Sequence, residues 1–311
     1  TIATQSHYIR SYLKNFLALS GDTSSLPFRV HDFGYRGVTC EEQAAIGAGA
    51  NLISFMGTDT IAGIRFLQQH YGAEMCGFSI PATEHMIMCA HKTELEACAK
   101  VLKEFPNGFI ACVSDTNDVF ACVEDIWGTK LKDTIIQRDG CLVVRPDSGD
   151  FKVIVPILLG ILKGKFGGRE KNGYFFLDDH VRLIQGDGMD KHSIYDLYKI
   201  ITDLGWSAEN LTVGSGGGLL QKVNRDTSKF AFKASAIKVD GEWRDIFKHP
   251  VTDKGKASKK GKLKLVKNSD GVFETVNISD PREDHLVPVF ENGEILKRYN
   301  LEQIKQNCGI I

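Results

Sequence analysis

The stretch LTVGSGGGLLQK, residues 211–222, contains one complete unit of the predicted fold. Apolar and β-branched residues come first, four glycines fill five positions after them, and a helix-like Leu-Leu-Gln-Lys follows. Glycine loses more backbone entropy on folding than any other residue, so a glycine-rich loop needs a reason. Its bare N–H groups can approach an anion at the positive end of a helix. The stretch predicts a strand, a loop and a helix, and the loop is either a phosphate site or a tight turn.

The same order of apolar run, polar loop and helical pattern recurs along the chain. The earlier runs with their loops are FRVHDFGYRG (28–37), NLISFMGTDT (51–60), CGFSIPATEH (76–85), FIACVSDTND (109–118), CLVVRPDSGD (141–150) and VRLIQGDGMD (181–190). A weaker eighth run is ASAIKVDGEW (234–243). Such apolar strands suit a parallel sheet that is covered on both faces. The pattern predicts an α/β protein with an irregular βα barrel, and a doubly wound open sheet is the alternative.

The composition excludes several classes of protein. The 311 residues are 42% hydrophobic and 25% charged, and the net charge is −1, so no global field attracts nucleic acid. The eight cysteines form no CxxC pair, which indicates reduced thiols in the cytoplasm rather than disulfides or a zinc site. The longest nearly apolar run, VIVPILLGIL, is too short to cross a bilayer. We expect a cytoplasmic protein without nucleic-acid or membrane partners, and the start without Met indicates a fragment or a processed form.

The loops that follow the predicted strands carry a distinctive set of charges. They contain His31, Asp32, Arg36, Asp59, Glu84, His85, Asp115, Asp118, Arg145, Asp147, Asp187 and Asp190, besides the glycines 214 and 216–218. In both candidate folds these loops share one face of the sheet. Arginine binds phosphate with a bidentate fork, and carboxylates bind ribose hydroxyls or magnesium, or accept protons. Helix capping explains some of the aspartates but not the arginines beside them. The face therefore predicts an active site for a phosphorylated sugar.

Five motifs in this order, HDFGYRG, GTDT, RPDSG, IQGDG and GSGGGLLQK, resemble the nicotinamide phosphoribosyltransferase family. The resemblance extends to SIPATEH and VSDTND and covers nearly the whole chain in segments. It implies transfer of phosphoribosyl from phosphoribosyl pyrophosphate (PRPP) to nicotinamide, with magnesium, which yields nicotinamide mononucleotide and pyrophosphate. It also implies a homodimer with the irregular α/β barrel of type II phosphoribosyltransferases. Family members are longer, and this chain corresponds to their C-terminal two thirds, so we expect a second domain to be incomplete.

The resemblance implies a role for several residues at the base. Phe33 is similar to the aromatic residue that stacks on the nicotinamide ring, and a core phenylalanine is the alternative. Asp59 resembles the carboxylate that accepts a hydrogen bond from the carboxamide, and it would repel the anion nicotinate. A helix N-cap is the alternative for Asp59. Ser79 and Ala82, in SIPATEH, are expected at the substrate as well.

Three residues resemble the catalytic group of the family. Arg145 would hold the carboxamide or the ribose side of the substrate, and Asp147 would orient the ring nitrogen and the ribose of PRPP. His85 resembles the histidine that ATP phosphorylates, which implies ATP as a stimulatory partner. No residue of the sequence is singled out as a magnesium ligand.

The remaining residues that the resemblance selects bind phosphate or ribose. Arg36 and the backbone amides of Gly216 and Gly217 would meet the phosphate, and Asp187 the ribose hydroxyls. Further phosphate ligands would be Arg225 and Lys233, and Lys248 and Lys256 would serve the pyrophosphate or the phosphates of ATP. Ala231 departs from the pattern, because the family often has serine there as a phosphate contact.

The predicted organisation is an N-terminal helical segment (1–27), a barrel (28–245) and a basic hairpin with a tail that packs on the barrel (246–311). Three other functions remain open. The alternatives are a nicotinate-specific phosphoribosyltransferase, a catalytically silent homologue that only binds nucleotide or phosphate, and a phosphosugar aldolase or isomerase. The last needs a Schiff-base lysine at a strand end, for which Lys238 is the only candidate.

Overall fold

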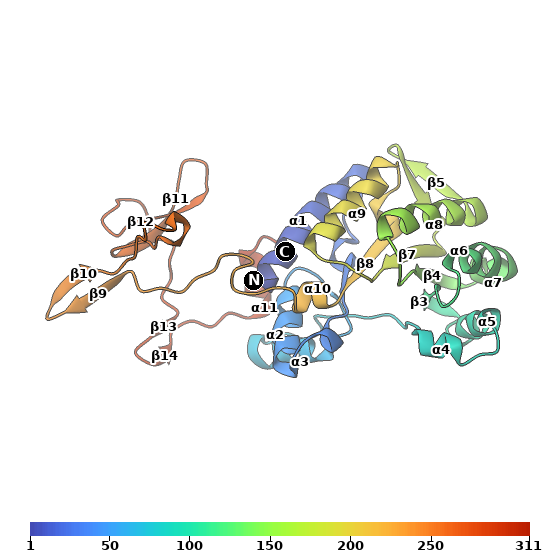
Figure 1. Cartoon of the computed structure of the whole chain (residues 1–311), viewed down its shortest axis with the longest axis horizontal. Coiled ribbons are helices and arrows are strands. Elements are labelled where there is room, and N and C mark those ends of the chain that lie inside the picture. The colour runs from blue at the N-terminus through green and yellow to red at the C-terminus, as the bar shows by residue number, and fades with distance from the viewer. The chain divides into compact units, whose positions relative to one another are not determined.

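The computed structural model describes residues 1–311, which form two compact units. The first unit comprises Thr1–Ser228 and Asn300–Ile311, and the second comprises Lys229–Tyr299 (Figure 1). The part of the chain that forms the barrel therefore stops at Ser228, before the boundary that we expected at residue 245. The C-terminal tail belongs to this first unit.

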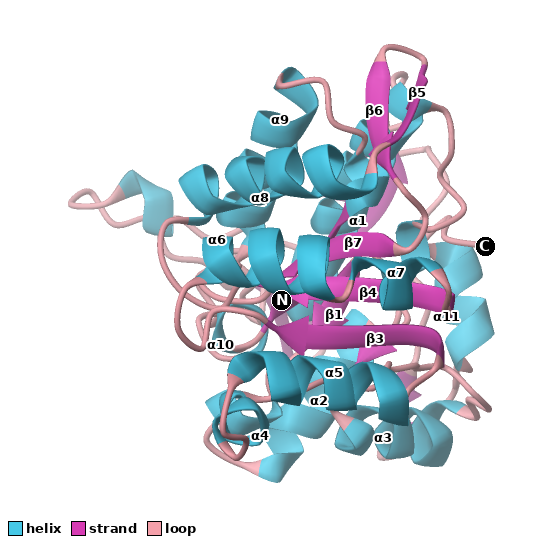
Figure 2. Ribbon diagram, turned by 90° about the vertical axis from the view of Figure 1, so that its right-hand side faces the viewer, coloured by secondary structure: helices cyan, strands magenta, loops and turns pink.

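A six-stranded sheet forms the centre of the first unit. Its order is β2 (Gly57–Thr58), β1 (Val30–Asp32), β8 (Leu211–Ser215), β7 (Val181–Gln185), β4 (Asp139–Arg145) and β3 (Asn107–Val113). Every neighbouring pair is parallel. Figure 2 shows strands of this sheet side by side with helices packed around them. Because the strands are parallel, the loops at their carboxyl ends lie at one face, as predicted.

The segment 78–83 closes the sheet into a barrel. On one side the Thr58 N–H donates to the Phe78 carbonyl at 2.9 Å, and on the other the Ala111 N–H donates to the Pro81 carbonyl at 2.9 Å. The segment is no regular strand, because proline has no N–H to donate to a ladder. Both edges of the sheet are nevertheless paired, which confirms the irregular α/β barrel and excludes the open sheet.

Helices surround the barrel and mostly follow its strands. They are α1 (Ile2–Ser20), α2 (Glu41–Asn51), α3 (Ile61–Tyr71), α4 (His85–Cys89), α5 (Glu94–Glu104), α6 (Val119–Ala121), α7 (Lys132–Ile136), α8 (Phe151–Phe166), α9 (Lys191–Asp203), α10 (Gly217–Leu220) and α11 (Leu301–Asn307). A π-helix spans Cys122–Lys130, and a hairpin that the sequence did not indicate joins β5 (Gly168–Lys171) to β6 (Tyr174–Leu177). No helix has the length and apolar character that crossing a membrane would require.

The sheet separates a large outer core from a small inner cluster. The outer core lies between the strands and the helices and includes the fully buried Trp127 and Leu142. The inner cluster contains Ala111, Cys141, Val143 and Ile184, against which Phe33 and Ile80 pack. The apolar runs of the sequence thus cover both faces of the strands, as a parallel barrel requires.

The second unit contains three separate hairpins. They pair β9 (Ala236–Val239) with β10 (Glu242–Asp245), β11 (Leu263–Lys267) with β12 (Phe273–Asn277) and β13 (Phe290–Glu291) with β14 (Glu294–Ile295).

The prediction of an eighth barrel strand at 234–243 is wrong. Asp240 and Gly241 both adopt positive φ, at 52° and 87°, so they form a tight hairpin turn of the kind that an Asp-Gly pair favours. Lys238 therefore lies in a hairpin and not at the end of a barrel strand. The aldolase or isomerase interpretation therefore loses its only candidate for a Schiff-base lysine.

Trp127 provides a test of the outer core. Its side chain is fully buried, and its Nε1–H donates to the Ser114 hydroxyl at 3.0 Å. Trp127→Ala should lower the free energy of unfolding by about 3–5 kcal/mol, because it leaves a large cavity. Urea titration followed by circular dichroism measures the change. The control Leu204→Ala removes an exposed side chain and should change stability by no more than about 0.5 kcal/mol. A free energy of unfolding that changes by the same small amount in both variants would contradict this packing of Trp127.

Candidate active site

Pairing of β1 with β8 brings two of the motifs together. Asp32 lies opposite Ser215 in the register, and the Phe33 N–H donates to the Ser215 carbonyl at 3.0 Å. The chain then passes the glycine loop so closely that a Cβ at Gly37 would lie 3.3 Å from the backbone of Gly217. Arg36 is exposed directly before this contact. The Gly37 backbone, next to Arg36 in the chain, therefore lies against the backbone of Gly217 in the glycine loop.

Two glycines make room for the Phe33 ring. A Cβ at Gly214 would lie 2.0 Å from Cε2 of Phe33, and one at Gly186 would lie 3.3 Å from the same atom. The ring is half-buried and packs on the inner cluster. It thus contributes to the core of the barrel, while its position after β1 places it at the carboxyl ends of the strands.

Asp59 is held by two donors on one oxygen. The Ser79 hydroxyl donates to its Oδ1 at 2.5 Å, and Nε2 of His31 lies 3.0 Å from the same Oδ1. Burial by itself would raise the pKa of Asp59, but these hydrogen bonds hold that pKa below its usual value. Asp59 is not the cap of α3, whose N-cap is Thr60. The N-cap interpretation is therefore wrong, and Ser79 and Asp59 do come together.

Arg145 lies at the centre of a second group of charges. Its side chain is buried, and Nη2 lies 3.4 Å from Oε2 of Glu84 and 3.9 Å from Oδ2 of Asp147. Its Nε is buried without a hydrogen-bond partner. Burial raises the pKa of Asp147, and the nearby Arg145 opposes that rise. The arginine thus retains donors that a ligand can use.

His85 and Asp115 complete this group. Nδ1 of His85 lies 3.2 Å from the Thr116 hydroxyl, and Nε2 lies 3.5 Å from Asp115 and 3.7 Å from Asp147. Asp115 is almost fully buried. Its Oδ2 accepts from the Asp147 N–H and the Ser148 hydroxyl, whereas Oδ1 has no hydrogen-bond partner. Asp115 and His31 belong to the loops that the sequence places at the active face, but neither was expected to have a role of its own.

The other predicted residues lie at different places. Asp187 is exposed in the loop after β7, where its carbonyl accepts from the Gln185 amide at 3.0 Å. Ala82 bridges to β3 within the closing segment. Arg225 is 77% exposed and pairs with the adjacent Asp226, so no site contact of Arg225 is seen. The three lysines predicted to bind phosphate, Lys233, Lys248 and Lys256, belong to the second unit, and their role stays a prediction.

The residues present do not form a cage for a metal ion. No group of three or more His, Cys, Asp or Glu side chains is placed to hold one. Mg²⁺ at phosphate substrates commonly uses only one or two carboxylates and keeps several waters. Asp115 offers an oxygen without a partner, and Asp147 has a carboxylate whose charged form is disfavoured by burial. These two side chains fit a cation that is shared with a substrate.

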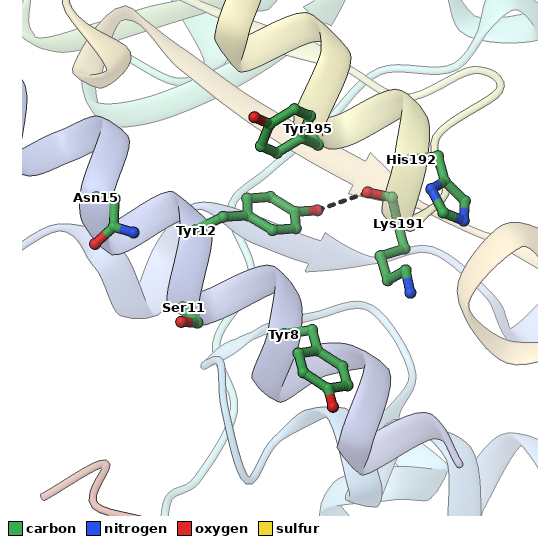
Figure 3. A pocket seen from close by; sticks show the side chains of 7 residues that line it. All are labelled: Tyr8, Ser11, Tyr12, Asn15, Lys191, His192 and Tyr195. Atoms are coloured by element: carbon green, nitrogen blue, oxygen red, sulfur yellow. Dashed lines mark hydrogen bonds between the residues drawn. The ribbon is translucent and has the colours of Figure 1, made fainter. Parts of the chain in front are cut away.

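A separate groove lies on the outside of the barrel. It has a volume of about 360 Å³ and is lined by Tyr8, Ser11, Tyr12, Asn15, Lys191, His192 and Tyr195. Figure 3 shows these side chains between α1 and α9, where the Tyr12 hydroxyl donates to the Lys191 carbonyl at 2.8 Å. None of the predicted site residues lines this groove.

Gly214 tests the position of the Phe33 ring. Gly214→Ala should force the ring aside and cost about 1–3 kcal/mol of stability, because the added methyl would overlap it. The aromatic ¹³C signals of Phe33 in the ligand-free chain should shift. Gly164→Ala, in α8, is the control, because its Cβ would meet nothing within 4 Å. Unchanged Phe33 signals in Gly214→Ala would refute this placement of the ring.

Comparison with known proteins identifies the family. The pattern of the nicotinate phosphoribosyltransferase (NAPRTase) family matches residues 28–294. A nicotinamide phosphoribosyltransferase of Xanthomonas campestris pv. campestris is 39% identical over 99% of this chain and 69% of its own length. One of Acinetobacter baylyi is 32% identical over 90% of this chain and 60% of its own length.

Two solved structures match this chain at low sequence identity. A nicotinate phosphoribosyltransferase of Porphyromonas gingivalis has a TM-score of 0.44 at 12% identity and covers 83% of this chain and 61% of its own. A putative one of Saccharomyces cerevisiae has a TM-score of 0.46 at 12% identity, over 99% of this chain and 63% of its own. On the match over residues 28–294 and the 39% identical relative, this chain belongs to the nicotinate phosphoribosyltransferase family.

Proposed function

We propose that this chain transfers the phosphoribosyl group of PRPP to nicotinamide and yields nicotinamide mononucleotide and pyrophosphate. The observation that carries the proposal is the meeting of two unlike subsites at one barrel face. Gly37 packs against the backbone of Gly217, and the exposed Arg36 directly precedes it, so an arginine and the amides of the glycine loop are available for a phosphate. Asp59 lies beside His31, whose ring contacts Phe33, which suits a planar base with a hydrogen-bond donor. The family membership and the names of the two bacterial relatives agree with this function.

Asp59 favours nicotinamide over nicotinate as the base. Its lowered pKa keeps it a carboxylate at neutral pH. A carboxylate only accepts hydrogen bonds, so it suits the NH₂ group of a carboxamide and repels the anionic carboxylate of nicotinate. A nicotinate-specific enzyme, the second candidate, would need a donor at this position.

The reaction is a displacement at the anomeric carbon of the ribose. The ring nitrogen of nicotinamide forms the new bond with its free lone pair, and the bond from carbon to the pyrophosphate oxygen breaks. Pyrophosphate leaves with that electron pair, and the ring nitrogen becomes cationic. Little proton transfer is needed, so the protein contributes mainly positioning and charge stabilisation.

The charged group around Arg145 suits the ribose end of this reaction. The carboxylates of Asp147 and Glu84 would stabilise positive charge that develops on the ribose. The unpaired Nε of Arg145 is a donor for the carboxamide or for a ribose oxygen. Asp115 accepts from the backbone N–H of Asp147 and so fixes the loop that carries it.

Magnesium and ATP enter as predictions of the resemblance. Asp115 and Asp147 would hold a magnesium ion that is bound to pyrophosphate, and the ion would offset the charge of that leaving group. ATP would phosphorylate His85. Because Nε2 of His85 faces two carboxylates, a phosphoryl group on that atom would need a cation beside it. A homodimer and a cytoplasmic location remain predictions as well.

The test is mononucleotide formation by the purified chain with PRPP, Mg²⁺ and either base, detected by mass spectrometry. Product should form from nicotinamide and not from nicotinate. Asp59→Asn should lower kcat/KM for nicotinamide about 10–100-fold, because it replaces a charge-assisted hydrogen bond with a neutral one. Asp59→Asn should also reduce the ratio of kcat/KM for nicotinamide to kcat/KM for nicotinate, because the negative charge that repels nicotinate is removed.

Asp196→Asn serves as the matched control. Asp196 is exposed on α9 and pairs only with Lys152, so its variant should keep the activity of the wild type. Product from nicotinate in preference to nicotinamide would contradict the proposal in favour of the second candidate. Binding of PRPP without product from either base would favour the silent homologue.

A further inference from the structure

His31 points to the same side of β1 as Phe33. Successive side chains of a strand alternate between its faces, so residues 31 and 33 share one. The two rings are in contact, with centroids 5.2 Å apart and planes inclined by 53°. The His31 side chain is only 12% exposed. It is therefore fixed between the barrel and the candidate base subsite.

Packing fixes the other edge of the His31 ring. In the register of β1 with β2, His31 lies opposite Gly57. A Cβ at Gly57 would lie 2.7 Å from Nδ1 of His31, so only glycine leaves room for the ring there. With Nδ1 against Gly57 and one side against Phe33, Nε2 is directed at Asp59, 3.0 Å away.

The two oxygens of Asp59 differ in their partners. Both His31 and Ser79 meet Oδ1, and Oδ2 has no hydrogen bond within the chain. A carboxylate can only accept, so the proton of the His31 ring must be on Nε2. The contacts to Oδ1 fix the plane of the carboxylate and leave Oδ2, on a side chain that is 48% exposed, open to a ligand.

We propose that His31 is a positioning residue that sets base preference by holding Oδ1 of Asp59, so that Oδ2 faces the carboxamide, and by supporting the Phe33 ring. This inference rests on the proposed function and extends it to a residue to which the sequence gave no role of its own. His31 acts only through Asp59 and Phe33. Ser79 supplies the second donor, so loss of His31 should loosen the carboxylate without abolishing the site.

The test uses His31→Ala and His31→Gln in the full chain. Glutamine retains an N–H donor at a similar distance from the backbone. The control is His70→Ala, because His70 is exposed in the last turn of α3. With PRPP, His31→Ala should raise KM for nicotinamide about tenfold, leave KM for PRPP unchanged and reduce the preference over nicotinate about tenfold. His31→Gln should recover most of this loss. His70→Ala should match the wild type.

A second readout does not depend on turnover. Carboxyl ¹³C NMR of the ligand-free chain, with the Asp59 signal assigned from Asp59→Asn, should show a higher Asp59 pKa in His31→Ala, because a stabilising donor is lost. The ¹⁵N shifts of His31 should show the proton on Nε2. If the alanine variant does not fold, His31→Leu retains bulk against Phe33 and Gly57.

The outcomes separate the two proposals. No product from nicotinamide with the wild-type chain would count against the proposed function. The NMR measurements would then still show whether His31 donates to Asp59. An unchanged Asp59 pKa in His31→Ala, or a His31 ring without a proton on Nε2, would overturn the positioning role. An active wild type whose base preference survives in His31→Ala would overturn it too.

Discussion

Backbone hydrogen bonds from the segment 78–83 to both edges of the sheet hold the candidate site together. The segment joins β2 to β3 and so turns six parallel strands into a closed barrel. It also carries Ser79 to Asp59 on one side, and it leads directly into Glu84 and His85 beside Arg145 on the other. If this segment were released, the barrel would open and both groups of charges would lose a member.

The site combines polar atoms whose hydrogen bonds are already made with others that have no partner within the chain. Oδ1 of Asp59 has two partners and Oδ2 has none, and the buried Nε of Arg145 is likewise unpaired. The Nε of Arg145 is the exceptional atom, because a buried polar atom without a partner is rare in folded proteins, whereas Oδ2 belongs to a side chain that is 48% exposed and open to a ligand. We interpret these free atoms as the positions at which a base and a ribose complete the hydrogen bonding.

The sequence predicted the architecture well, because each barrel strand is a continuous apolar run with its own polar loop. It failed at 234–243, where the turn chemistry of Asp240 and Gly241 prevailed over the apolar pattern. It also gave no role to His31 or Asp115. Their partners, Asp59 and His85, are distant in the chain and become adjacent only when neighbouring strands pair, which a pattern of residues along one strand cannot reveal.

A crystal structure of the chain with nicotinamide mononucleotide tests the central claim most directly, namely that one barrel face joins a phosphate subsite to a base subsite. The account predicts the phosphate at Arg36 and the amides of Gly216 and Gly217, the ring against Phe33 and the carboxamide nitrogen at Oδ2 of Asp59. A mononucleotide bound elsewhere, for example in the groove between α1 and α9, or a carboxamide turned away from Asp59, would contradict it.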